Sequence, residues 1–399
     1  NPTLTIFNTL NWKRSEMLTV YIDFEVIPRN QFFEITDFQG HSLKVQPIRY
    51  RREGCYYAIF AEDIPPMGYK TFEIVFKQPS TDTGTITINN ASIENHFYKL
   101  QLNPYKGTIQ SLYDKELNCE LVDSSSPWEL GAFIYEKLGN RDQLAQYRLD
   151  DYNRTGLSEC RIIDSSNGPI YQRILLQGKS PGTDEAFGVN LEIKLYHDTK
   201  RIELEYAIKR LPETDPSGIY VAFPFQLPEG KLAFDVQGGT VISGKNQLEG
   251  TSTDWNTVQN FVSVQNNQAQ IIIGSSLIPL YQLGDINLGK FQYQKQYERP
   301  HVYSWVMNNY WNTNFKASQE GEFRWSYHLT SSVDPSNNLA TKFGWSSRIP
   351  LYARVMPTGT ENHKPTEYSA FHFEKDNFLM TSCTPSKEEG YILLNIREI

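Results

Sequence analysis

One short stretch of this sequence combines side-chain amides with aromatic rings. It contains Asn308, Asn309, Tyr310, Trp311, Asn312, Asn314 and Phe315. Amides hydrogen-bond to hydroxyl groups and flat rings stack on C–H faces, and together these are the contacts that hold sugars. The alternative is a polar loop whose rings only close a hydrophobic core. Composition by itself favours that alternative, so the sugar-binding interpretation needs support from elsewhere in the chain.

The residues that follow this stretch have the pattern of an antiparallel strand. Phe323, Trp325, Tyr327 and Leu329 fall on one face, and Glu322, Arg324, Ser326 and His328 fall on the other. Strict alternation places successive side chains on opposite sides of a sheet. The pattern predicts a half-buried strand with an aromatic inner row.

A self-contained metal site is not evident in the sequence. Catalytic zinc needs about three His, Asp, Glu or Cys ligands, usually with two of them close in sequence. The 7 histidines include no H-x-H, H-E-x-x-H or H-x-D pattern. His197 and Asp198 fall in an expected hairpin turn, and His372 with Glu374 is only a weak ligand pair.

Nucleophile and nucleotide signatures are also missing, since there is no G-x-S-x-G and no phosphate-binding loop. Glycoside hydrolysis uses a pair of carboxylates across a pocket. With 46 Asp and Glu residues, the sequence does not single out a pair. Asp254 and Glu320 are the carboxylates nearest to aromatic neighbours, and capping of a loop or turn is the preferred interpretation for both.

Composition limits the classes of partner. The 399 residues carry a formal net charge of −8, so nucleic acid and anionic membranes are unsuitable partners. No apolar run is long enough for a membrane-spanning helix. The 4 cysteines are far apart, which leaves one disulfide possible and excludes a dense framework. The start at Asn1, without methionine or targeting segment, leads us to expect a piece of a longer protein, and the compartment is left open.

The chain is predicted to be all-β. Short apolar runs separated by Gly and Pro turns predict a small β-sandwich over residues 1–82, ending at the polar segment 79–84. Longer alternating runs, including one at 86–88, predict a large sheet system over residues 83–345. The apolar run 128–135 is expected to be buried on both faces. Further strands are expected over 346–399, and short helices only at 140–147 and 257–264.

Several segments together resemble one known family. Six matches follow in the family's order, at residues 8–14 (NTLNWKR), 107–115 (GTIQSLYDK), 222–225 (AFPF), 247–255 (QLEG and TDW), 279–284 (PLYQLG) and 308–315 (NNYWNTNF). They resemble the β half of glycoside hydrolase family 38, the α-mannosidases, and the last segment is the most distinctive of them.

The resemblance implies a small β-sandwich, a galactose-mutarotase-like supersandwich and a short C-terminal β return packing on the preceding domains. It implies a retaining α-mannosidase in which zinc, the nucleophilic Asp and the acid/base carboxylate come mostly from an N-terminal catalytic barrel of the same chain. That barrel is missing from this sequence, so no catalytic residue or metal ligand is assigned. The implied partners are the barrel and a mannose-containing glycan.

The resemblance also implies substrate contacts at the rim of the active site. Related enzymes place a substrate-facing Tyr where this chain has Phe133, with Tyr135 two residues on. The candidates for substrate binding are Phe133, Tyr135, Asn308, Asn309, Trp311 and Asn314. Packing between the sheet and the barrel is the alternative role for these residues.

Two other functions are left open by the sequence. One is a free-standing carbohydrate-binding module that uses the same amide and aromatic stretch. The other is a mutarotase-like epimerase, in which His96, His197 or His301 would act with a carboxylate base.

Overall fold

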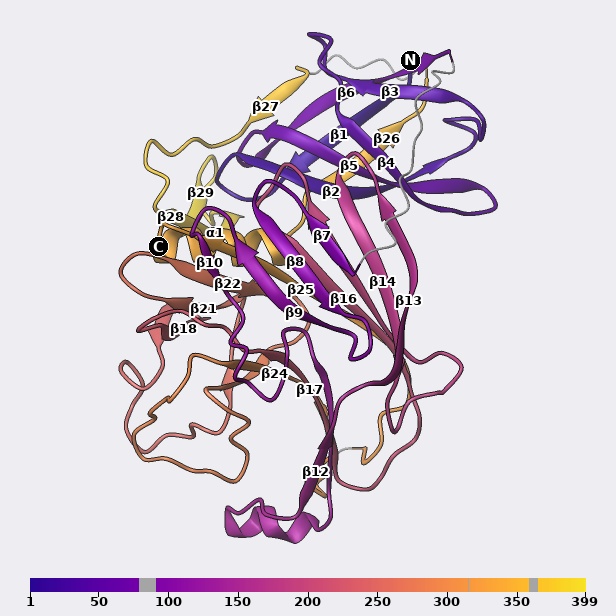
Figure 1. Cartoon of the computed structure of the whole chain (residues 1–399). Coiled ribbons are helices and arrows are strands. Elements are labelled where there is room, and N and C mark those ends of the chain that lie inside the picture. The colour runs from indigo at the N-terminus through magenta and orange to yellow at the C-terminus, as the bar shows by residue number, and fades with distance from the viewer. Residues whose placement is uncertain (79–90, 315, 359–364) are drawn as a thin grey trace. The chain divides into compact units, whose positions relative to one another are not determined.

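The computed structural model of this chain describes residues 1–78, 91–314, 316–358 and 365–399. Across these ranges the elements are almost entirely antiparallel strands, with one α-helix and one 3-10 helix (Figure 1). The predicted all-β class is confirmed. The chain divides into two compact units. The first comprises Asn1–Ile86, Asn167–Tyr171 and Ile349–Ile399, and the second comprises Thr87–Ser166 and Gln172–Arg348.

The first unit is a small sandwich of two sheets with a hairpin attached. One sheet contains β26 (Tyr352–Met356), β1 (Thr3–Asn8), β6 (Gly68–Lys77), β27 (Glu367–Ser369) and β3 (Phe32–Thr36). The other contains β2 (Arg14–Asp23), β5 (Gly54–Ile64) and β4 (Lys44–Tyr50). The hairpin is β28 (Phe378–Pro385) with β29 (Ile392–Glu398). Strand β1 alternates with Leu4 and Ile6 fully buried, as a strand with one core face does. Strands from both ends of the sequence thus build the predicted sandwich and the β return.

The second unit contains two large antiparallel sheets and a small one. The six-stranded sheet runs β12 (Tyr152–Thr155), β11 (Phe133–Leu138), β17 (Ser217–Phe223), β24 (Val302–Asn308), β23 (Leu280–Leu283) and β20 (Asn256–Thr257). The nine-stranded sheet runs β13 (Ser158–Asn167), β14 (Tyr171–Lys179), β15 (Val189–Tyr196), β16 (Ile202–Arg210), β25 (Gly321–Ser332), β22 (Gln270–Gly274), β21 (Phe261–Gln265), β18 (Lys231–Val236) and β19 (Gly239–Ile242). The small sheet runs β10 (Cys119–Glu120), β9 (Thr108–Asp114), β8 (Tyr98–Asn103) and β7 (Ser92–Glu94).

The core of the second unit lies between the two large sheets. Phe223 of β17 meets Tyr327 of β25 edge to face, with ring centroids 5.0 Å apart. On the opposite face of the six-stranded sheet a second apolar cluster contains Ile134, Tyr220 and Trp305. Strands β11 and β17 are therefore buried on both sides, which confirms the prediction for the apolar run that ends in β11. This is the supersandwich arrangement that the family resemblance implies.

The inner row of β25 also follows the prediction, but its other face does not. Trp325, Tyr327 and Leu329 are buried, whereas His328 on the opposite face is buried as well. His328 Nε2 lies 3.8 Å from the Glu203 carboxylate of β16, within a charged cluster on that face. Alternation alone shows that a face is polar, not that it is open to water.

Three local expectations have clear outcomes. The short helix expected at 140–147 is the 3-10 helix η1 (Arg141–Gln146), capped by the Asn140 side chain. The helix expected at 257–264 is wrong, because this run forms the end of β20 and most of β21. Its apolar residues pair with β18 and β22, and such a short run does not separate helix from strand by itself. Helix α1 (Asn337–Arg348), which packs on β21 and β22, was not expected.

Three expectations concern residues outside the described ranges. They are the strand at 86–88, the polar segment 79–84 and the role of Phe315. In the part of the chain that the structure describes, no helix is long and apolar enough to cross a membrane.

Candidate functional site

The ends of three neighbouring strands gather part of the amide stretch into one place. Asn308, the last residue of β24, pairs with Gly218 near the start of β17. Gly218 also pairs with Glu136 of β11 on its other side. Antiparallel pairing therefore brings the beginning of β17 beside the end of β24. Arg210, at the end of β16 in the nine-stranded sheet, also lies at the start of β17. Its guanidinium donates a hydrogen bond to the Ser217 hydroxyl.

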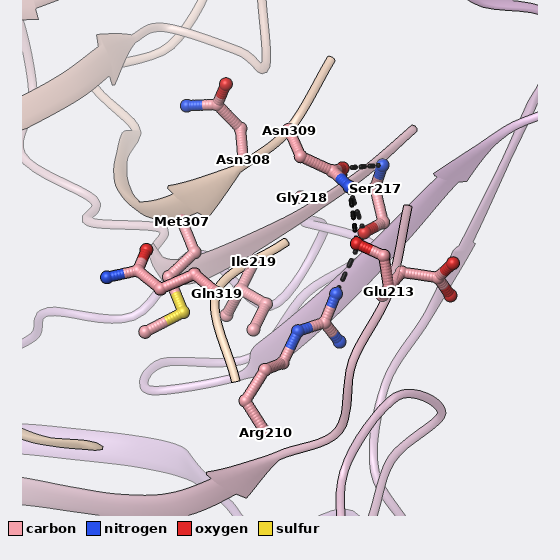
Figure 2. A pocket seen from close by; sticks show the side chains of 9 residues that line it. All are labelled: Arg210, Glu213, Ser217, Gly218, Ile219, Met307, Asn308, Asn309 and Gln319. Carbon is pink, nitrogen blue, oxygen red and sulfur yellow. Dashed lines mark hydrogen bonds between the residues drawn. The ribbon is translucent and has the colours of Figure 1, made fainter. Parts of the chain in front are cut away.

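A small pocket opens where these strands end (Figure 2). It is lined by Arg210, Glu213, Ser217, Gly218, Ile219, Met307, Asn308, Asn309 and Gln319. Its volume of about 20 Å³ holds roughly one water molecule. The pocket can therefore receive one polar group of a ligand, such as a hydroxyl, but not a whole sugar ring.

Arg210 forms one wall of the pocket. Its side chain is 8% exposed and donates to the Ser217 hydroxyl at 2.9 Å and to the Gly182 carbonyl at 3.1 Å. The guanidinium also lies 5.5 Å from the centre of the Tyr135 ring, within range of a cation–π contact. These contacts hold the guanidinium in a fixed position beside the pocket.

Asn309 acts as a clamp between loops. Its side-chain oxygen accepts hydrogen bonds from the backbone N–H of Ser217 at 2.7 Å and from the Ser217 hydroxyl at 3.3 Å. Its side-chain nitrogen donates to the carbonyls of Glu213 at 2.9 Å and Ala317 at 3.0 Å. Because both donors of the amide are used and its oxygen already accepts two bonds, little capacity is left for a ligand.

Asn308, Asn312 and Asn314 are the amides of the stretch that remain accessible. All three side chains are exposed, and Figure 2 shows the Asn308 amide apart from the network that joins Arg210, Ser217 and Asn309. Trp311 is 38% exposed, whereas Tyr310 between these residues is fully buried. The stretch thus divides into residues that hold the fold and residues that face solvent.

Phe133 and Tyr135 both point into the core between the two large sheets. Phe133 is 1% exposed and Tyr135 is 4% exposed, and both belong to the main apolar cluster. The Tyr135 hydroxyl still comes within 3.5 Å of the Glu213 carboxylate, which lines the pocket. Tyr135 is therefore adjacent to the candidate site, whereas Phe133 contributes packing.

The buried carboxylate of Glu136 supports the loop that contains Tyr310. The Glu136 carboxylate is fully buried, accepts a 2.5 Å hydrogen bond from the Tyr310 hydroxyl and forms an ion pair with Arg154 at 2.5 Å. Burial alone would lower the pKa of Arg154, but the charge and hydrogen bond of Glu136 outweigh it and raise that pKa. This arrangement anchors Tyr310 and, through it, the neighbouring residues 309 and 311.

The described residues do not provide a metal centre. Within them there is no group of three or more His, Cys, Asp or Glu side chains that could hold a metal ion. Glu320, one of the two carboxylates singled out earlier, is part-exposed and pairs with Lys316 at 2.7 Å, as a loop residue would. Asp254, the other, is buried.

Sequence reasoning missed most of the pocket lining. Arg210, Glu213 and Ser217 lie in or next to a loop between two strands, and no motif marks them. The only signal is that this loop joins strands of the two large sheets, so that its residues gather at a sheet edge. That signal becomes usable once the pairing of the strands is known.

Comparisons with known proteins agree with this architecture. They show that the chain contains a domain of the glycoside hydrolases. Residues 93–291 match the C-terminal domain of glycosyl hydrolases family 38. The chain therefore carries the family 38 C-terminal domain, and the family resemblance noted in the sequence is confirmed. No curated protein sequence matches the chain significantly.

Solved structures show the same fold. An α-mannosidase from Enterococcus faecalis V583 aligns with a TM-score of 0.70 at 13% identity, covering 98% of this chain and 50% of that chain. A family 38 glycosyl hydrolase from Enterococcus faecalis aligns with a TM-score of 0.67 at 13% identity, covering 98% of this chain and 52% of that one. The chain thus spans about half the length of these two structures.

Proposed function

We propose that this chain is the C-terminal β region of a retaining, metal-dependent α-mannosidase. In this role it supports a catalytic barrel that precedes it and contributes residues to the rim of the substrate site. The observation that carries the proposal is the match of residues 93–291 to the family 38 C-terminal domain. The similarity of fold over half the length of an α-mannosidase agrees with it.

The pocket at the ends of β17 and β24 supports a role at the substrate rim. Arg210 is held rigidly on one side and the Asn308 amide is free on the other. Such a pocket can position one hydroxyl of a mannose-containing glycan, because a guanidinium donates to it and an amide can both donate and accept. Asn309 holds Ser217 in place, and the Ser217 hydroxyl in turn accepts a hydrogen bond from Arg210.

Exposed apolar side chains in the first unit support docking of a further domain. Tyr391, Ile392, Leu393 and Ile396, in or next to β29, are each more than half exposed. Clusters of exposed apolar residues commonly mark contacts with other protein surfaces. In the proposal they contact the catalytic half.

Zinc belongs to the other half in this proposal. The side chains of the described residues do not form a suitable donor set, so they do not fit a catalytic zinc ion. The nucleophile, the acid/base carboxylate and the metal ligands are therefore all assigned to the catalytic barrel.

The test compares the 399-residue chain with the full-length product of its gene. Both are assayed on an aryl α-mannoside, with and without a chelator, and zinc is added back afterwards. We expect activity only in the longer protein, inhibition by the chelator, recovery with zinc, and an α-configured first product by NMR, as retention requires.

Two results would overturn the proposal. Hydrolysis by the 399-residue chain alone would place the catalytic residues within the β-sheets. Inactivity of both proteins, together with mannoside binding by the chain, would favour the free-standing binding module instead.

A further inference from the structure

A larger cavity in the second unit is lined by Trp311, the residue after Tyr310. It has a volume of about 510 Å³, well within the range of about 300–1,000 Å³ that small-molecule sites occupy. Its walls come from η1, from the segment around residue 254, from the loop around residue 290 and from Trp311. These four segments are far apart in sequence and come together above the outer face of the six-stranded sheet.

Aromatic rings form two groups around this cavity. Trp255 and Trp311 contact each other with ring centroids 5.8 Å apart and planes inclined by 54°. Trp305 lies behind both of them and is itself buried, with its ring 5.5 Å from Trp255 and 6.2 Å from Trp311. The two lining rings are thus fixed by a buried ring rather than free to turn.

The second group stands at the rim. Tyr147 and Phe291 meet with ring centroids 6.3 Å apart, and both line the cavity. They are 71% and 46% exposed, so both rings present apolar surface at the rim of the cavity. The cavity therefore has two fixed rings as its inner wall and two exposed rings at its mouth.

One carboxylate faces this aromatic lining. Asp254 lines the cavity and is only 4% exposed. Its Oδ1 atom is buried and has no hydrogen-bond partner among the residues that the structure describes. Burial raises the pKa of this carboxyl group, and it outweighs the backbone N–H of Gly289 and the charge of Lys295, which both lower it. A buried acceptor without a donor costs about 1–3 kcal/mol, so the site is incomplete without a ligand that donates.

We propose that this cavity binds a pyranose ring of a neutral glycan. The C–H face of the sugar stacks on the exposed face of Trp311, and a sugar hydroxyl donates to Oδ1 of Asp254. Flat rings beside one charged acceptor provide the two contacts that a pyranose needs, an apolar face and a hydroxyl partner.

A cationic ligand is the main competitor, because aromatic rings and a carboxylate also bind ammonium groups. Two features oppose it. Lys295, only 8% exposed, lies close enough for its charge to act on Asp254, so the local field already contains a cation. The two tryptophan rings also contact one another, whereas an ammonium cage needs rings that surround an open centre.

This inference does not depend on hydrolysis and goes beyond the proposed function. The binding is a property of the 399-residue chain, whereas the proposed activity is measured on the longer protein. Failure of one test therefore leaves the other unaffected.

The experiment titrates methyl α-D-mannopyranoside into the 399-residue chain, with methyl α-D-glucopyranoside and methyl α-D-galactopyranoside as parallel probes. Binding is followed by intrinsic tryptophan fluorescence and by saturation-transfer NMR. We expect saturable binding of at least one probe, weakened about tenfold in Trp311→Ala and about tenfold in Asp254→Asn, as loss of one stacking contact or one charge-assisted bond predicts.

Matched variants separate binding from folding. Tyr105→Ala, which removes an exposed ring outside this cavity and outside the pocket of Figure 2, is the control and should leave the affinity unchanged. Asp254→Asn keeps the size of the side chain but takes a counter-charge away from Lys295, so its thermal unfolding midpoint is measured beside the affinity to show that the fold is retained. This variant tests the site even if Trp311→Ala is destabilised.

Three results would overturn the proposal. The first is that none of the three glycosides binds. The second is binding that persists unchanged in both Trp311→Ala and Asp254→Asn. The third is competition by tetramethylammonium at concentrations that leave an ionic-strength control unaffected, which would identify a cation site.

Discussion

The side-chain oxygen of Asn309 accepts a 2.7 Å hydrogen bond from the backbone N–H of Ser217, across 92 residues of sequence. Asn308, its neighbour, presents its amide to solvent instead. Two adjacent asparagines of the same stretch therefore differ: the Asn309 side chain holds the pocket together, and the Asn308 side chain is exposed.

Replacement of each asparagine should separate these roles. Asn309→Ala leaves the Ser217 N–H and two loop carbonyls without their partner, so we expect a loss of about 2–3 kcal/mol in the free energy of unfolding. Asn308→Ala should change stability by less than about 0.5 kcal/mol, as exposed substitutions usually do. Denaturant unfolding of both variants checks this. Equal losses in the two variants would contradict the distinction.

The same pair also tests the proposed rim site. In the full-length enzyme, Asn308→Ala should lower kcat/KM on an aryl α-mannoside about fivefold, which corresponds to the loss of one neutral hydrogen bond. Its unfolding midpoint serves as the control and should match that of the parent enzyme. An unchanged kcat/KM would remove Asn308 from the substrate rim.

Gly218 should not tolerate a side chain. A Cβ atom there would lie 2.0 Å from the Tyr310 hydroxyl oxygen and 2.6 Å from the ring carbon that carries it. Gly218→Ala must therefore displace Tyr310 from its bond with Glu136, and we expect a loss of about 2–4 kcal/mol. Gly239→Ala is the matched control, because nothing lies within 4 Å of its added Cβ. Thermal and denaturant unfolding of both variants give the comparison.

Removal of the charge on Glu136 should be costly because its partner stays buried. Glu136→Gln leaves the Arg154 guanidinium without its counter-ion, and we expect a loss of about 3–5 kcal/mol. The double variant Glu136→Gln with Arg154→Met should recover part of this loss, since the unpaired charge is gone. Glu320→Gln, which breaks an exposed ion pair, should leave the free energy of unfolding nearly unchanged. A double variant no more stable than Glu136→Gln would rule out the charge explanation.

Lys295 should make the free energy of unfolding change with pH in the alkaline range. Burial lowers the pKa of its ammonium group from 10.5 to about 8. Below pH 8 the lysine is charged in both folded and unfolded chains, and the folded state carries the cost of burying that charge. Between pH 8 and 10.5 only the unfolded chain keeps the proton, so the contribution of Lys295 to stability rises with pH.

Lys295→Met removes that titration. We expect the variant to be about 1–3 kcal/mol more stable than the parent chain at pH 7, because the cost of burying the charged ammonium, which the nearby Asp254 carboxylate partly offsets, is removed. The difference should shrink between pH 8 and 10.5. Urea unfolding of both proteins across this range measures it, and a constant difference would exclude Lys295 as the titrating group.

Local patterns in the sequence were sufficient to predict strands and to identify the family. Alternation in β25 identifies its buried row because the two faces of a strand differ in a period of two residues, which any sheet preserves. The order of the family segments identifies the domain, because this order can be read from the sequence without knowing the fold. The mistaken helix at 257–264 shows the limit of such patterns, because an apolar run this short is compatible with either structure.

Only the tertiary structure decided what the chemically active residues do. Asn308 and Asn309 are the same residue type in the same stretch. The Asn309 side chain bonds to Ser217 and to the loop before β17, whereas the Asn308 side chain is exposed although its backbone pairs with Gly218 of β17. Asp254 has the sequence context of a turn residue, yet the loop around Gly289 buries it beside Trp311. Burial and hydrogen-bond partners come from segments distant in sequence. A single stretch therefore determines which polar and aromatic groups are present. The packing of the whole unit determines which of these groups are buried or hydrogen-bonded and which are exposed.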